Sequence, residues 1–183
     1  MSDLRPRGGT IEIGEEKFRL LFSIKTIDEI QSELNIPIFD AIEVLLKAAK
    51  GATDAETIGI YAGVITAIIN TNNTKKVTLT EVIEQITPEN YSVNAVALMK
   101  LFWSGMPEED DYDPDDEEDE KKESERAVNI ARLLYIGCSI LGYTEEEVFN
   151  MTMRKFYLIY DQYLYAKRIK KHEDINEKDM FRD

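Results

Sequence analysis

Few residues in this chain could carry out covalent chemistry. It contains one histidine, His172, and one cysteine, Cys138. A zinc site needs several Cys and His ligands, and a thiol nucleophile needs a neighbouring base, so one residue of each type supplies neither. His172 lies in a basic C-terminal stretch and is expected at the surface. Cys138 lies on the apolar face of a predicted helix and is expected to be a small buried hydrophobe.

Glycine-rich phosphate-binding motifs are also missing from the sequence. It contains neither a P-loop pattern nor the glycine pattern of dinucleotide-binding domains. Gly59 and Gly63 are four residues apart, and close packing of a helix explains that spacing. We find no acid and base pair with a reason to be coupled. We therefore expect no catalytic residue, no cofactor and no metal site, and an enzyme is disfavoured.

The largest group of potential ligands is the acidic run from Glu108 to Glu120, in which eleven of thirteen residues are Asp or Glu. The run lacks the ligand spacing of an EF-hand, so it would bind Ca²⁺ only weakly and without selectivity. Like charges at this density repel one another and leave little apolar surface to bury, which favours a solvated linker. The run predicts three parts, namely residues 1–106, an acidic flexible linker at 107–122, and residues 123–183.

The overall composition argues against several classes of protein. A net charge of −14 and a pI near 4.6 disfavour nucleic acid as a partner. No stretch of about 18 apolar residues could cross a membrane, so no membrane contact is expected. The N-terminus lacks the apolar core of a signal peptide. A single cysteine forms no internal disulfide, and a cytosolic location fits best.

The N-terminal part begins with a predicted β-hairpin. Residues 10–13 and 17–22 alternate apolar and polar side chains around Gly14, which predicts two strands joined by a tight turn. A lone hairpin is only marginally stable in water, so it must pack on the helices or pair with another chain. Its apolar side chains are therefore candidate partner-binding residues, namely Phe18, Leu20 and Phe22.

The remaining sequence has the apolar periodicity of helices. The predicted helices span residues 26–35, 37–51, 53–69, 78–86, 87–105, 123–141, 144–149 and 153–172. Capping boxes predict three of the starts, at Thr26, Thr78 and Thr144. The fold class is therefore mainly α, with a small N-terminal β-hairpin plus a helical bundle, the acidic linker, and a short C-terminal helical module.

The last predicted helix carries more aromatic residues than one helix face can bury. They are Phe156, Tyr157, Tyr160, Tyr163 and Tyr165. Packing against the predicted helix 123–141 is one explanation. Docking of a partner is the other, because tyrosine offers a large contact area at low entropy cost. The basic residues that follow complement the helix dipole, and they could also meet the acidic linker of the same or a neighbouring chain; they are Lys167, Arg168, Lys170 and Lys171.

Two segments resemble the tail assembly chaperones of long-tailed phages and prophages of Gram-positive bacteria. Residues 8–45, GGTIEIGEEKFRLLFSIKTIDEIQSELNIPIFDAIEVL, resemble the hairpin and the Ile-Asp-Glu-Ile helix of their first module. Residues 133–163, LLYIGCSILGYTEEEVFNMTMRKFYLIYDQY, resemble their second module. The resemblance covers most of residues 8–106 and 126–166. One departure is Asn35, where the family pattern has glycine, and asparagine tolerates the same left-handed helix cap.

The resemblance implies a role in virus assembly. Such chaperones coat the long tape-measure protein and keep it soluble, and their extension is thought to recruit tail-tube subunits. It also implies that the protein acts in the host cytoplasm and is absent from the finished virion. The expected partners are thus the phage tape-measure protein and the tail-tube protein, and a second copy of the chain is a further candidate.

The resemblance also suggests how the two modules are joined. In this family a programmed ribosomal frameshift adds the second module to a minority of chains. Lys121 and Lys122 lie at the junction, and a lysine pair can be encoded by an A-rich slippery run. We hypothesise such a frameshift here, and the absence of any slippery heptamer between codons 100 and 126 would count against it.

A second hypothesis comes from a different class of protein. The chain would be a non-enzymatic adaptor or regulatory protein that docks a bacterial target through its C-terminal tyrosine-rich helix. A neighbouring tape-measure gene would favour the chaperone. Stoichiometric binding to a polymerase or a repressor would favour the adaptor.

Overall fold

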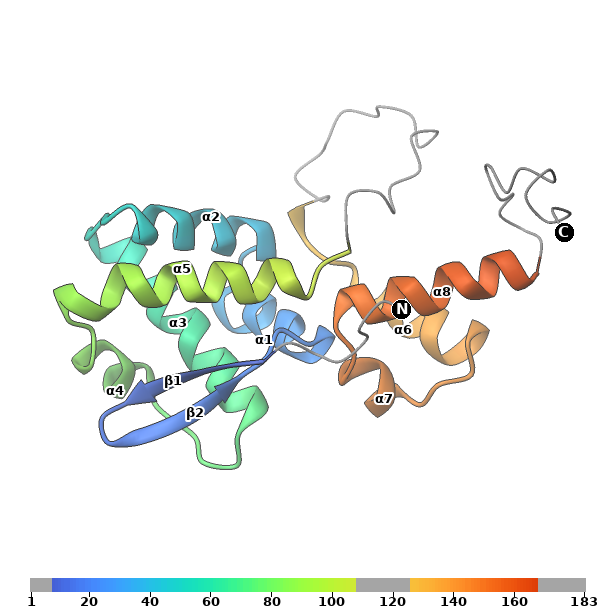
Figure 1. The fold of residues 1–183 in the computed structure, drawn as a ribbon, viewed down its shortest axis with the longest axis horizontal. Coiled ribbons are helices and arrows are strands. Elements are labelled where there is room, and N and C mark those ends of the chain that lie inside the picture. Colours follow the sequence, from blue (N-terminus) through green and yellow to red (C-terminus); the bar gives the residue numbers. More distant parts are fainter. Residues whose placement is uncertain (1–7, 108–125, 168–183) are drawn as a thin grey trace, which may run out of the picture.

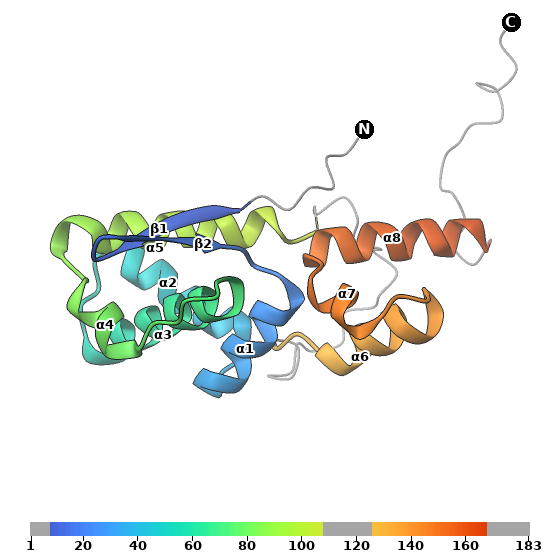
Figure 2. The same cartoon turned by 90° about the horizontal axis from the view of Figure 1, so that it is seen from below.

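The computed structural model describes residues 8–107 and 126–167 (Figures 1 and 2). The described chain is mainly helical with a small antiparallel hairpin at its start, so the predicted fold class is confirmed. Several features named from the sequence lie outside the described residues. They are the acidic linker beyond Pro107, the lysine pair of the proposed frameshift, His172 and the basic residues after Lys167.

The hairpin consists of β1 (Gly9–Ile13) and β2 (Glu16–Leu20). Gly14 has a φ of 63°, the left-handed conformation that the tight turn requires and that glycine adopts at little cost. Ile11 pairs with Phe18 across the two strands, and both side chains are buried. The period of two along each strand therefore places one apolar face of the hairpin on the helices.

Five helices follow in the N-terminal unit, which comprises residues 8–107. They are α1 (Ile24–Leu34), α2 (Ile38–Ala49), α3 (Ala55–Asn72), α4 (Leu79–Glu84) and α5 (Pro88–Ser104). α3 contacts α1, α2, α4 and β2, and it is buried on most of its circumference between Tyr61 and Ile69. A helix that is apolar on nearly all sides belongs at the centre of a domain, and α3 has that place here.

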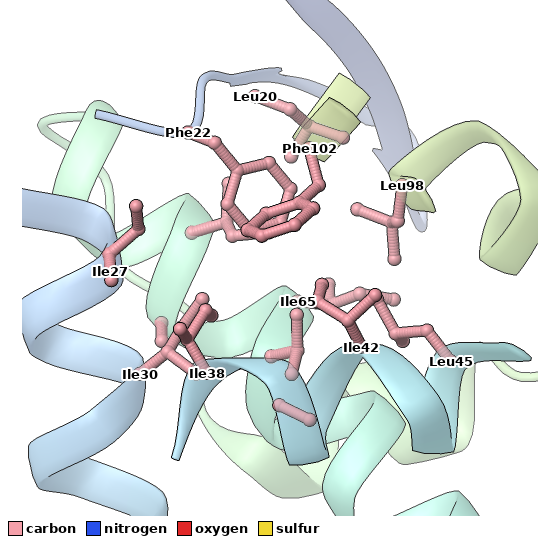
Figure 3. Packing of buried hydrophobic residues seen from close by; sticks show 14 of the residues in the cluster. Leu20, Phe22, Ile27, Ile30, Ile38, Ile42, Leu45, Ile65, Leu98 and Phe102 are labelled. Atoms are coloured by element: carbon pink, nitrogen blue, oxygen red, sulfur yellow. The ribbon is translucent and has the colours of Figure 1, made fainter. Parts of the chain in front are cut away.

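α2 and α5 pack side by side in opposite directions (Figures 1 and 2). Phe39 of α2 meets Phe102 of α5 at one end, and the hydroxyl of Ser92 donates a hydrogen bond to the carbonyl of Ala48 at the other. Figure 3 shows the core between these helices, with Phe22 from the hairpin side lying against Phe102.

Several predicted helix ends are confirmed, and the predicted start of the first helix is wrong. Asn35 ends α1 with a φ of 52°, as its left-handed tolerance predicts. The capping box predicted at Thr26 does not form. Ser23 caps α1 instead, and its hydroxyl accepts a hydrogen bond from the Thr26 N–H at 3.2 Å. Thr26 is buried and donates its own hydroxyl to the carbonyl of Leu21, so the helix begins at Ile24.

The third and second helices also differ slightly from prediction. α3 begins at Ala55, capped by Asp54, and continues to Asn72 rather than ending at Ile69. The side-chain amide of Asn72 donates to the carbonyls of Ile68 and Leu21, which holds this last turn against the hairpin side of the core. Pro37 is the residue before α2 rather than its first helical residue.

The C-terminal unit comprises residues 126–167. It contains α6 (Ile130–Leu134), a π-helical turn labelled η3 (Tyr135–Ile140), α7 (Glu145–Phe149) and α8 (Met153–Ala166). Gly142 has a φ of 79°, a left-handed conformation that stops the helical segment directly after the predicted end at residue 141. The capping box at Thr144 is confirmed, as is the one at Thr78. α8 ends at Ala166, and residues 168–172 of the predicted last helix lie outside the described residues.

Residues 123–125 of the helix predicted over 123–141 lie outside the described residues, and within the described part this helix begins at Ile130. The cause is a clamp on Val128 by Gln31 of α1. The Gln31 side chain donates to the Val128 carbonyl at 3.1 Å and accepts from the Val128 N–H at 2.8 Å. Both backbone groups are therefore committed to another element, and Asn129 caps the helix after them.

The two units meet through backbone groups at helix ends, which a helix cannot satisfy internally. The N–H of Ile24, at the start of α1, donates to the carbonyl of Met151 at 2.8 Å. The N–H of Arg154, at the start of α8, donates to the carbonyl of Gly105 at 2.7 Å. α8 consequently continues the direction of α5 (Figures 1 and 2), and the dipoles of the two helices align head to tail.

Ion pairs at the edge of the contact between the two units, which we call the joint, also hold the units together. Arg126 lies 2.6 Å from Asp40 and also pairs with Glu43, and both carboxylates belong to α2. The three side chains are between two-fifths and two-thirds exposed, so solvent weakens these pairs. Apolar residues of both units also belong to one continuous buried cluster.

The two confirmed capping boxes give the protein an acid-sensitive element. Hydrogen bonds from the backbone N–H and then the hydroxyl of Thr78 hold the pKa of Glu81 below its ordinary value of 4.5. Thr144 does the same to the pKa of Glu147. Because each pKa is lower in the folded chain, this stabilisation is complete above pH 4.5 and is lost as the pH falls through the folded pKa.

We expect the double variant Glu81→Gln/Glu147→Gln to lose less stability on acidification than the wild-type chain. Glutamine keeps an acceptor for the capping N–H but does not titrate. The measurement is the urea midpoint of unfolding at intervals between about pH 6 and pH 3. Curves that run parallel over this whole range would contradict the expectation.

Candidate partner-binding surfaces

The three hairpin-side residues predicted to bind a partner are inside the N-terminal unit. Phe18 and Leu20 are each 4% exposed, and Phe22 is 2% exposed. Figure 3 shows Leu20 and Phe22 lying against Phe102 of α5. The hairpin is thus stabilised by packing on the helices of its own chain. These three side chains are therefore not available to a partner at the surface.

Phe18 also lines a shallow pocket of about 260 Å³ between the hairpin turn and α4. Ile13 and Val77 share its apolar part, and glutamates and lysines surround it. Lys75 forms an ion pair with Glu16 at its edge. The pocket holds neither a histidine nor a thiol, so it offers no nucleophile with an adjacent base.

The aromatic stretch of α8 is divided between core and surface. Phe156 is fully buried, and its ring lies 3.3 Å from the position that a Cβ on Gly137 of η3 would take. Packing against the preceding helical segment therefore explains this residue. Tyr157 and Tyr160 pack partly against the core, and burial raises the pKa of the Tyr157 hydroxyl.

The C-terminal end of α8 is more open. Tyr163 and Tyr165 are both partly exposed, and the ammonium of Lys167 lies 5.8 Å from the centre of the Tyr163 ring. That distance permits a cation–π contact. We call Tyr163, Leu164 and Tyr165 the aromatic end of α8. It keeps the predicted tyrosines at the surface, where a partner can reach them.

Two further apolar surfaces in the N-terminal unit were not singled out from the sequence. Leu79 and Ile83, which we call the α4 pair, are 45% and 41% exposed and lie one turn apart on one helix. On α5, Val93 is 67% exposed, Val96 38% and Trp103 54%.

The residues of α5 separate cleanly into two faces. Its core residues are Tyr91, Ala95, Leu98 and Phe102. Glu89, Val93, Val96, Lys100 and Trp103 lie about 180° away around the helix, and we call them the α5 stripe. A helical projection of the sequence separates these two sets, but both contain apolar residues, so it does not say which set faces the core.

Residues 8–107 and 126–167 contain no group of three His, Cys, Asp or Glu side chains placed to hold a metal ion. Cys138 is partly buried. Burial raises the pKa of Tyr61 to about 12, so its hydroxyl stays protonated at neutral pH.

Comparisons with known proteins give no assignment for these surfaces. No family model, curated protein or solved structure matches the chain. Among the helices of the described ranges, none has both the length and the apolar character needed to cross a membrane. The roles of the α4 pair, the α5 stripe and the aromatic end of α8 are therefore argued from their geometry.

Proposed function

We propose that this protein is a tail assembly chaperone of a long-tailed phage or prophage. It binds the tape-measure protein, keeps it soluble and recruits tail-tube subunits in the host cytoplasm, and it is absent from the finished virion. The observation that carries the proposal is a strongly acidic protein with an exposed apolar pair on its N-terminal unit and partly exposed tyrosines on its C-terminal unit. The resemblance of residues 8–45 and 133–163 to such chaperones supplies the class.

The α4 pair is the proposed contact for the tape-measure protein. A tape measure is long and mostly helical, and an apolar ridge from one of its helices can lie across two exposed side chains spaced by one turn. The net charge of −14 supports solubility once the apolar surface of the tape measure is covered.

The aromatic end of α8 is the proposed contact for the tail-tube protein. It lies on the other unit from the α4 pair, so both partners can be held at once (Figure 1). Partly exposed tyrosines are frequent anchors of protein interfaces. If the chain instead docks a bacterial target, as the adaptor hypothesis holds, this same surface would bind it.

Co-expression with the tape-measure protein tests the proposal. Full-length chains are needed, because the C-terminal unit contacts the N-terminal one through Ile24, Gln31 and Gly105. We expect the wild-type chain to keep the tape measure in the soluble fraction. Leu79→Asp/Ile83→Asp should lower that fraction about tenfold, since two buried contacts are replaced by charges.

Matched variants make the result specific. Thr80→Asp/Gln85→Asp adds the same two charges at exposed positions around the same helix and should behave as wild type. Tyr163→Ala/Tyr165→Ala should leave tape-measure solubility unchanged and weaken capture of the tail-tube protein. If the wild-type chain does not change the solubility of the tape measure, the chaperone proposal fails and the adaptor role takes its place.

A further inference from the structure

We propose that the α5 stripe pairs two copies of this chain, with the two α5 helices packed antiparallel about a two-fold axis. This inference is independent of the proposed function. It rests on the order of residues along the stripe, their exposure and their charges.

The stripe is one continuous surface. With 3.6 residues per turn, Glu89, Val93, Val96, Lys100 and Trp103 fall within about 80° of the helix circumference. Val93 and Trp103 are more than half exposed, and Glu89 and Lys100 are exposed charges. The Trp103 ring meets the buried ring of Phe102 edge to face, with 5.2 Å between the ring centres.

The order of residues along the stripe is symmetric about the midpoint between Asn94 and Ala95. Val93 and Val96 lie one and a half residues on either side of that midpoint. Glu89 and Lys100 lie five and a half residues on either side, and they carry opposite charges. Two-fold pairing requires a surface that is complementary to itself, and this arrangement satisfies that requirement.

Antiparallel pairing about this midpoint brings matched side chains together. Val93 of each copy lies over Val96 of the other, and Glu89 of each copy faces Lys100 of the other. Trp103 reaches the level of Ile86 of the other copy, which is partly buried just before its α5. Parallel pairing would place Glu89 against Glu89 and Lys100 against Lys100, so the charges select the antiparallel orientation.

Two further features fit this arrangement. Hydrogen bonds from its own N–H and from Thr87 hold the pKa of the Glu89 carboxyl below its ordinary value of 4.5, so it is charged at neutral pH. On α2, which runs antiparallel to α5, Leu46 is a further exposed apolar side chain, at 39%. The surface is small beside standard interfaces of roughly 800 Å² per partner, so we expect a dissociation constant on the order of micromolar.

Sedimentation equilibrium of the full-length chain over a wide concentration range tests the pairing. We expect a monomer–dimer equilibrium for the wild-type chain. Val93→Asp/Val96→Asp should abolish dimerisation, because two pairs of aspartates that repel each other would replace the paired valines at the centre of the interface. Tyr135→Asp/Ser139→Asp adds the same two charges at exposed positions of the C-terminal unit, outside the stripe, and should leave the equilibrium unchanged.

Charge reversal tests the orientation. Glu89→Lys and Lys100→Glu should each weaken dimerisation about tenfold, because each places like charges together at both ends. The double variant Glu89→Lys/Lys100→Glu should return to within about threefold of the wild-type dissociation constant. An equimolar mixture of the two single variants should form a heterodimer, which a mere loss of helix stability could not produce.

Three results would overturn the proposal. One is a wild-type chain that stays monomeric at a concentration of several hundred micromolar. Another is dimerisation that survives Val93→Asp/Val96→Asp. The last is a set of charge variants that all dimerise as the wild type does, since the antiparallel register would then be wrong. Circular dichroism of each variant checks that the helices remain folded.

Discussion

Phe102→Ala should lower the free energy of unfolding by about 3–5 kcal/mol, the range for removing a buried aromatic ring. The Phe102 side chain is completely buried. Its ring makes edge-to-face contacts with Phe22 at 5.3 Å, Phe39 at 6.0 Å and Trp103 at 5.2 Å between ring centres. Alanine would remove all three contacts and leave a cavity where α2, α5 and the end of the hairpin meet.

Urea unfolding of the dilute protein, followed by circular dichroism, measures this loss. Tyr135→Ala is the matched control, because it also deletes an aromatic ring but at a position that is 64% exposed. We expect the control to change stability by less than about 0.5 kcal/mol. A loss below about 1 kcal/mol for Phe102→Ala would mean that the ring is not part of a packed core.

Gly137→Ala is expected to cost about 1–3 kcal/mol, because it overpacks the centre of the C-terminal unit. A Cβ at Gly137 would lie 2.3 Å from a methyl carbon of Val148 and 3.3 Å from the ring of Phe156. Both neighbours are completely buried. The branched side chain of Val148 has few rotamers with which to avoid the new methyl group, so α7 would have to shift away from η3.

A second substitution can relieve this clash. Val148→Ala removes the methyl groups that meet the new Cβ, so Gly137→Ala should cost less in that background than in the wild type. The double-mutant cycle measures the difference as a coupling energy. Gly59→Ala is the control, because nothing lies within 4 Å of its Cβ position in α3, and alanine there should be neutral or slightly stabilising.

Local patterns in the sequence were sufficient for most of the fold. The alternation around Gly14 predicted the hairpin, and Thr78 and Thr144 marked helix starts that the structure confirms. These features depend on residues close together in the chain, because a cap or a tight turn is completed within a few positions.

The differences arise where distant residues compete with local ones. Thr26 had the spacing of a capping residue, but Ser23 caps the helix and Thr26 bonds to Leu21 in the core. Val128 had helical neighbours, but Gln31, almost a hundred positions earlier, takes both of its backbone groups. No periodicity in the sequence contains such information, because it depends on the tertiary arrangement.

The candidate partner-binding surfaces also differ in how far local sequence patterns predict them and how far they depend on tertiary packing. The hairpin phenylalanines were expected at a partner surface because a free hairpin is unstable, yet the protein's own helices cover them. The tyrosines of α8 could be predicted as a group, but only their packing separates buried Phe156 from the more open Tyr163. The α5 stripe requires knowing which side of the helix faces the core.

The joint between the two units has a consequence for the chain that connects them. The units are held by Ile24 with Met151, Gly105 with Arg154 and Gln31 with Val128, and residues 108–125 link them covalently. Because both units belong to one chain, the C-terminal unit meets its contact surface on the N-terminal unit at a far higher effective concentration than a separate molecule would. One cut within residues 108–125 would remove that advantage. The two pieces would then stay associated in concentrated solution and separate on dilution, so a single protease site there would make the joint depend on protein concentration.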